Sequence, residues 1–211
     1  MKKESQVIFD KNVIEFVTVA AEFCAFLERA ESMKRSTFVD TTLKILPLLY
    51  LKASMLPKCE MIGDESPETY VTEEIYEVLR INLASILAEK DDYLEVFLPD
   101  MANSLEPITK NISEDLADIY QDIKDFIFVF QLGLNETMND SLAICQENFG
   151  LLWGQKLVNT MRALHDVKYS PKARGEDEEE EEYEPENNED CHCEDDDCHC
   201  HDHGCHCHDD E

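Results

Sequence analysis

The chain has 211 residues, and its 48 acidic and 18 basic residues give a formal net charge of −30 at pH 7. Phosphate backbones are bound by clustered Lys and Arg, and anionic membrane surfaces repel a protein this acidic. We therefore expect neither nucleic acid nor a membrane among its partners.

Targeting and membrane segments are not expected either. Asp10, Glu15 and Glu22 interrupt any apolar stretch that could serve as a signal peptide. No apolar run approaches the roughly 18 residues that a membrane-spanning helix needs. The three cysteines before the last segment, Cys24, Cys59 and Cys145, are scattered and odd in number, which favours free thiols over a disulfide framework. These features predict a cytoplasmic protein.

The first half of the chain predicts three helices from the spacing of its apolar residues. A stripe of apolar residues runs from Val13 to Leu27. A second, more apolar helix should start at Ser36 or Thr37 and run to Pro57 as a central helix, with a kink at Pro47. Residues 60–70 contain Gly and Pro and are expected to form a loop, and a third helix is expected over residues 72–89.

The second half predicts two long helices after a segment that is harder to assign. Residues 91–112 contain two prolines and one possible short helix at residues 93–98. Ser113 is a suitable N-cap for a helix with an apolar stripe from Leu116 to Phe130, and Gly133 suits the position just after its end. Asn135 is expected to cap the last helix, which runs towards Val167. Its expected core positions are Leu142, Cys145, Phe149, Leu152, Trp153, Leu157, Met161 and Leu164.

Together these patterns predict an all-α fold with little or no sheet. Residues 1–169 should form a single helical bundle of about five to six helices, since about 170 residues suit one domain with a substantial core. An acidic disordered linker is expected over residues 170–190, followed by a Cys/His-rich tail over residues 191–211. Residues 171–211 carry 19 acidic and two basic residues, a net charge of −17.

No catalytic motif is present, and we predict a non-enzymatic protein with no catalytic residues. The chain lacks H-E-x-x-H, P-loop and dinucleotide-binding patterns, and Arg162 stands where a Glu-x-x-His motif would need a Glu before His165. Trp153, Arg162 and His165 could line a pocket for an anion, but a core Trp with a surface Arg and a helix-terminal His is the favoured interpretation. Gly150 and Gly154 favour close packing, and the acidic pairs at residues 73–74 and 91–92 are expected on solvated faces.

Three stretches in the second half of the chain resemble a known family. Phe149-Gly150-Leu151-Leu152-Trp153-Gly154, then Arg162-Ala163-Leu164-His165, together with residues 119–126, resemble an uncharacterised bacterial helical family, domain of unknown function 5063. The likeness spans roughly residues 7–167 and leaves out the tail. It implies an all-helical fold and no established activity.

The last 21 residues are three tandem heptads, CHCEDDD, CHCHDHG and CHCHDDE. They have no large apolar residues, so the period does not indicate a coiled coil. Thiolate and imidazole groups are the ligands that zinc and softer metals prefer. The expected metal ligands are Cys191, His192, Cys193, Cys198, His199, Cys200, His201, His203, Cys205, His206, Cys207 and His208.

Twelve such ligands could complete up to three four-coordinate sites. Zinc is the expected metal, with nickel and copper(I) as alternatives. The tail could then buffer, store or deliver metal while the helical body docks a protein partner. In an alternative interpretation the body is an interaction adaptor and the tail only a solubilising or regulatory appendage. A third, an enzyme with an unrecognised site, has no motif in its favour.

Overall fold

The computed structural model describes residues 7–95 and 108–170, and within them the predicted all-α fold is confirmed. The helices and strands are α1 (Lys11–Glu28), α2 (Arg35–Ser54), α3 (Glu73–Leu87), β1 (Asp92–Leu94), β2 (Thr109–Asn111), α4 (Ile112–Gln131), α5 (Asn135–Asn148) and α6 (Gly154–Tyr169). One π-helical turn, η4 (Phe149–Trp153), joins α5 to α6, and short 3-10 turns cover Val7–Phe9, Ala30–Ser32 and Ala88–Lys90.

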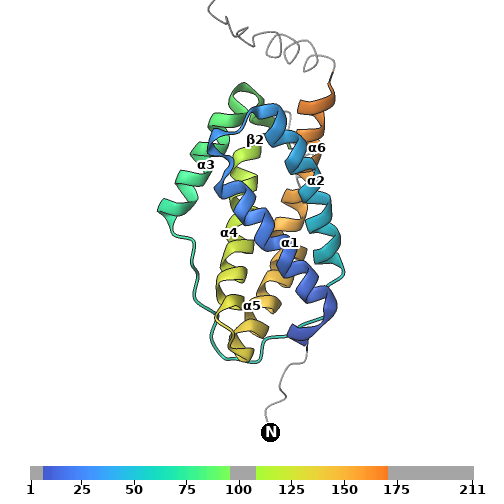
Figure 1. Cartoon of the computed structure of the whole chain (residues 1–211), viewed down its shortest axis with the longest axis vertical. Helices are drawn as coiled ribbons and strands as arrows, with labels where there is room; N and C mark the ends of the chain where they lie inside the picture. Colours follow the sequence, from blue (N-terminus) through green and yellow to red (C-terminus); the bar gives the residue numbers. More distant parts are fainter. Residues whose placement is uncertain (1–6, 96–107, 171–211) are drawn as a thin grey trace, which may run out of the picture.

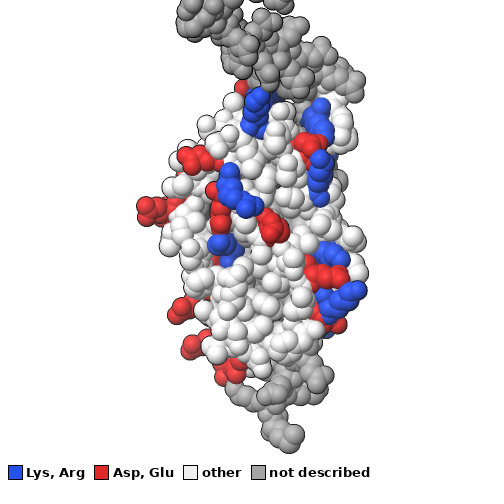
Figure 2. Space-filling view, viewed as in Figure 1, with Lys and Arg blue, Asp and Glu red and all other residues white. Residues whose placement is uncertain are grey.

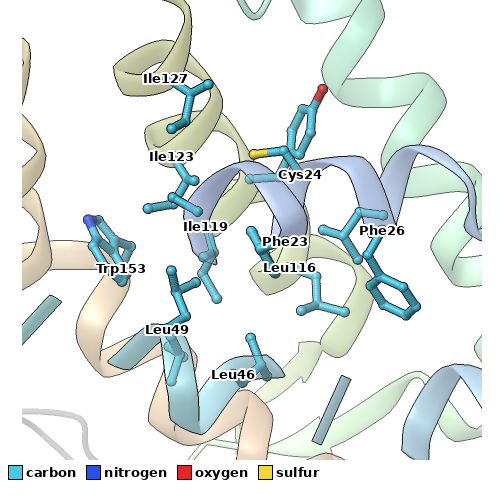
Figure 3. Packing of buried hydrophobic residues seen from close by; sticks show 14 of the residues in the cluster. Phe23, Cys24, Phe26, Leu46, Leu49, Leu116, Ile119, Ile123, Ile127 and Trp153 are labelled. Carbon is cyan, nitrogen blue, oxygen red and sulfur yellow. The ribbon is translucent and has the colours of Figure 1, made fainter. Parts of the chain in front are cut away.

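Helix α4 lies at the centre of the bundle. It packs against α1, α3, α5 and α6, and α1 crosses in front of it in Figure 1. In Figure 3 its Ile119 and Ile123 lie among the buried side chains of the core, near Trp153 and Leu49. The prediction that the second helix is central is wrong, because α2 exposes Leu48 and Leu51 to solvent. The amphipathic stripe of α4, rather than the overall apolar content of α2, decides which helix is enclosed.

Local capping explains where several helices begin and end. The Asp10 carboxylate accepts the backbone N–H of Asn12 at 2.8 Å and starts α1. The Thr72 hydroxyl accepts the N–H of Ile75 at the start of α3. Gly133 lies just after α4 with φ of +74°, as predicted, because glycine adopts this left-handed conformation without steric cost.

The segment between α3 and α4 differs from the prediction. The helix predicted at residues 93–98 is wrong for residues 93–95, which are the part that the structure describes. There β1 pairs with β2 in an antiparallel ribbon that sets Tyr93 opposite Lys110. Ser113 is not the N-cap, because α4 begins at Ile112. Asp91 is buried and accepts both the backbone N–H of Ser113 at 2.7 Å and its hydroxyl at 2.6 Å. The expectation of a solvated Asp91 is therefore also wrong.

The predicted single helix towards Val167 is divided by the π-helical turn. The N-cap is Leu134 rather than Asn135, and the π-helical turn at Phe149–Trp153 inserts one extra residue, which shifts the buried stripe. Leu152, expected in the core, is 53% exposed, whereas Trp153 is fully buried. A Cβ atom on Gly154 would lie 2.3 Å from the Phe149 carbonyl oxygen, while one on Gly150 would meet nothing within 4 Å.

Charged side chains are distributed unevenly over the face of the bundle that Figure 2 shows. Figure 2 shows acidic side chains along the edge that α3 occupies in Figure 1, and Lys and Arg beside acidic partners near α1 and α2. Within the two described ranges, none of the helices is both long and apolar enough for a membrane crossing.

Candidate functional site

The predicted metal ligands, from Cys191 to His208, all lie outside the described residues. Within residues 7–95 and 108–170, no three or more His, Cys, Asp or Glu side chains come together as a metal site would require. The metal site predicted from the heptads therefore stays a prediction.

The three body cysteines are free thiols, as predicted. Burial raises the pKa of Cys24 to about 12 and raises the pKa of Cys145 well above its ordinary value. Cys59 is half-buried, and burial followed by the nearby Asp140 charge raises its pKa too. Cys24 and Cys145 are poor metal ligands, because burial both encloses them in the core and disfavours their thiolate forms.

Of the three residues Trp153, Arg162 and His165, the structure brings Arg162 and His165 to one cavity of about 660 Å³, which Asp92 and Asp166 also line, and places Trp153 elsewhere. The Trp153 indole N–H donates to the Cys145 carbonyl at 3.1 Å inside the core. Arg162 donates to the Leu94 carbonyl at 2.9 Å, and the His165 ring packs on Tyr169. The favoured interpretation, a core Trp with Arg and His on the surface side of α6, agrees with this arrangement.

A row of four carboxylates along one face of α4 was missed in the sequence. Asp115, Asp118, Asp122 and Asp125 follow each other at spacings of three, four and three residues, which places them on one helical face. That spacing is a signal that the sequence contains. Each carboxylate fastens a different element to α4 and therefore helps to set the geometry of the bundle.

The contacts of the row are specific. Asp115 accepts from the Tyr93 hydroxyl at 2.5 Å, and Asp118 accepts from the Tyr76 hydroxyl at 2.8 Å and pairs with Lys156. Further along α4, Asp122 accepts from the Asn148 side-chain amide at 2.5 Å. The last carboxylate, Asp125, accepts the backbone N–H groups of Tyr70 and Val71 at 2.7 Å each.

Partial burial leaves three of these carboxylates short of compensating charge. Desolvation raises the pKa of Asp115, Asp122 and Asp125, and it outweighs the lowering effect of their hydrogen-bond donors. Neighbouring carboxylates add to the rise at Asp122. The face of α4 is therefore a place where an added positive charge would be favourable.

A cavity of about 410 Å³ opens along this face. Its apolar surface comes from α4, α5 and η4, and the loop before α3 forms one wall. Its lining includes Glu68, Asp122, Asp125, Phe126, Val129, Ile144, Leu152 and Trp153. We name this cavity the α4–α5 groove. Its size falls within the range of ligand-binding clefts.

The loop that walls the groove is tied down by α5. The buried Asp140 carboxylate accepts the N–H of Ile62 at 2.7 Å and of Gly63 at 2.8 Å. Gln146 accepts the N–H of Cys59 at 3.0 Å, and Asn139 donates to the Glu60 carbonyl at 2.8 Å. The groove wall is therefore built on hydrogen bonds from buried or half-buried side chains. The hydrogen-bonded carboxylates and the apolar lining of the α4–α5 groove suit it to bind a ligand.

A family model described as "Domain of unknown function (DUF5063)" matches residues 7–170. A crystal structure of a protein from Bacteroides fragilis, a structural genomics target, is 92% identical and has a TM-score of 0.73. The alignment covers 80% of this chain and 99% of that chain. No curated protein matches. The resemblance seen in the sequence is confirmed.

Proposed function

We propose a function for this chain, which belongs to the family described as domain of unknown function 5063, on the basis of its own ligand chemistry. It is a non-enzymatic cytoplasmic protein whose C-terminal tail binds transition metal for buffering, storage or delivery, and whose helical body docks a protein partner. Zinc is the principal metal, and nickel and copper(I) are alternatives.

One observation carries the proposal: six cysteines and six histidines fall within residues 191–208. With four ligands per ion, they could hold up to three zinc ions. The acidic residues between them concentrate divalent cations, and a bound ion deprotonates its thiol ligands outright. Binding should therefore release protons and weaken as the pH falls.

The chemistry of the body supports the choice of the tail as the metal site. Burial raises the pKa of Cys24 and Cys145, so these thiols stay protonated at neutral pH. The single body histidine, His165, packs on Tyr169. The buried Cys24 and Cys145 therefore compete little with the tail ligands for metal.

The alternative function, a protein-interaction adaptor, is favoured by a different observation. Leu48 and Leu51 on α2 and Leu151 in the π-helical turn are exposed apolar side chains, and Tyr50 of α2 packs against Phe149 of the same turn. Large exposed apolar surfaces are typical of interaction sites. In that case the tail would only solubilise or regulate the adaptor.

The test replaces all six tail cysteines by serine. High-affinity zinc binding should be lost while weaker histidine-based nickel binding persists, because imidazole groups can ligate nickel without thiolates. Cys59→Ser, a half-buried body thiol, is the matched control and should leave zinc affinity unchanged. In cells, a tail deletion should alter growth under metal limitation or excess. If the deletion behaves like the intact protein while loss of the whole protein is harmful, the adaptor function is correct.

A further inference from the structure

The α4–α5 groove joins an apolar floor to an acidic rim. Phe126, Val129 and Ile144 line it from α4 and α5, and Leu152, 53% exposed, stands beside it. A second cavity of about 630 Å³ lies beside it, and Pro67, Glu68 and Val129 line both cavities. Residues 63–69 of the loop before α3 contribute to the walls of the two neighbouring cavities.

The charge of this surface is strongly one-sided. The acidic side chains that line the two cavities are Asp64, Glu65, Glu68, Asp118, Asp122, Asp125, Glu136 and Asp140. Among the described residues that line them, Lys156 is the one Lys or Arg, and it is already paired with Asp118. These eight acidic side chains, which we call the acidic rim, therefore complement a partner with several positive charges.

Two occupants from this chain are disfavoured by the same charge. Residues 171–211 carry a net charge of −17, and a second copy carries −30. Both would meet like charges along the rim, which opposes association. Asp122 and Asp125 already have raised pKa values because they are partly desolvated, so a further negative group nearby would be unfavourable.

We propose that the α4–α5 groove docks a basic peptide segment of a partner protein, with Lys or Arg side chains on the acidic rim and one apolar side chain on the floor beside Leu152. This inference rests on the proposed function in one respect, namely that the body docks a protein. It does not depend on whether the tail binds metal.

The probes are synthetic peptides of about ten residues, each with four lysines around a central Leu, Phe or Met at varied spacing. Matched peptides replace the lysines by Glu or the central residue by Ser. They are titrated into the full-length, metal-free, reduced protein at physiological salt. Trp153, the single tryptophan, reports by fluorescence, and the side-chain amide of Asn148 reports by NMR.

Two pairs of variants locate the binding. Leu152→Ser should weaken binding roughly tenfold, whereas its neighbour Leu151→Ser, 70% exposed and outside the lining of the groove, should not. Glu65→Gln with Glu68→Gln should weaken it by roughly threefold or more. Glu73→Gln with Glu74→Gln removes the same charge from an exposed site on α3 and should have little effect.

The proposal is overturned if no lysine peptide of the panel shifts the Trp153 and Asn148 signals. It is also overturned if Leu151→Ser weakens binding as much as Leu152→Ser, or if both acidic pairs weaken it equally, because binding would then follow overall charge. Zinc titration of the same protein tests the tail separately. Peptide binding without zinc binding would support the groove as a docking site and contradict metal handling by the tail. Zinc binding without peptide binding would support metal handling and contradict the docking site.

Discussion

The Asn148 side-chain amide donates to the Asp122 carboxylate at 2.5 Å and ties the end of α5 to the middle of α4. Asn148 lies directly before the π-helical turn that carries Trp153. This single contact therefore links the acidic row on α4, the turn in the last helices and the lining of the groove.

Removing the amide donor of Asn148 should lower the free energy of unfolding more than removing the charge of Asp122. Asn148→Ala leaves a partly buried carboxylate with less compensation, and we expect the free energy of unfolding to fall by about 1–3 kcal/mol. Asp122→Asn keeps an amide oxygen that can accept the bond and removes a desolvated charge, so stability at neutral pH should be equal or higher. Urea unfolding at pH 7.5 measures both. A larger loss for Asp122→Asn would contradict this account.

The two glycines of the π-helical region should respond in opposite directions to alanine. Gly154→Ala places a Cβ 2.3 Å from the Phe149 carbonyl oxygen, so a loss of about 1–3 kcal/mol is expected from overpacking. Gly150→Ala meets nothing within 4 Å and should gain about 0.5–1 kcal/mol from reduced unfolded-chain entropy. Thermal unfolding of the pair measures the difference, and equal effects would show that the turn does not need Gly154.

Asp140 should control the loop that walls the groove. Asp140→Ala strands the N–H groups of Ile62 and Gly63, and we expect a loss of about 2–4 kcal/mol. Amide hydrogen exchange across residues 57–69 should accelerate at the same time. Glu147→Ala, an exposed acidic position on the same helix, is the control. Unchanged exchange in Asp140→Ala would mean that other contacts fasten the loop.

Stability should have its maximum at mildly acidic pH. Raised pKa values at Asp115, Asp122 and Asp125 mean that the folded state binds their protons more tightly, so stability rises as the pH falls from neutral through those values. Lys168 and Lys44 lower the pKa of Asp40 to about 2, and that contribution is lost as the pH falls below 3.8 towards 2. Urea unfolding between pH 8 and pH 3 tests this, and a steady decline on acidification from neutral would contradict it.

The sequence predicts the helices well where one local pattern decides the outcome. The stripe at Val13–Leu27 and the glycine at position 133 needed only helical periodicity and the conformational freedom of glycine. The features that were missed depend on distant partners. Asp91, directly before β1, bonds the first turn of α4, and β1 exists only because β2 pairs with it.

The candidate groove illustrates the same limit. The spacing of Asp115, Asp118, Asp122 and Asp125 is visible in the sequence, but it resembles an ordinary solvated face of a helix. Only the packing of β1 on Asp115, of α5 on Asp122 and of the loop before α3 on Asp125 shows that these three carboxylates are partly desolvated. The exposure of Leu152 likewise depends on a π-helical turn whose extra residue shifts the helical register.

The most direct test of metal handling is native mass spectrometry of the reduced full-length protein and of a chain ending at Tyr169, each with added zinc. We expect up to three zinc ions on the full-length protein, because twelve thiol and imidazole groups lie within residues 191–208. The shorter chain should bind none stoichiometrically. Tight stoichiometric zinc on the shorter chain would contradict the assignment to the tail, and no zinc on the full-length protein would contradict the proposed function itself.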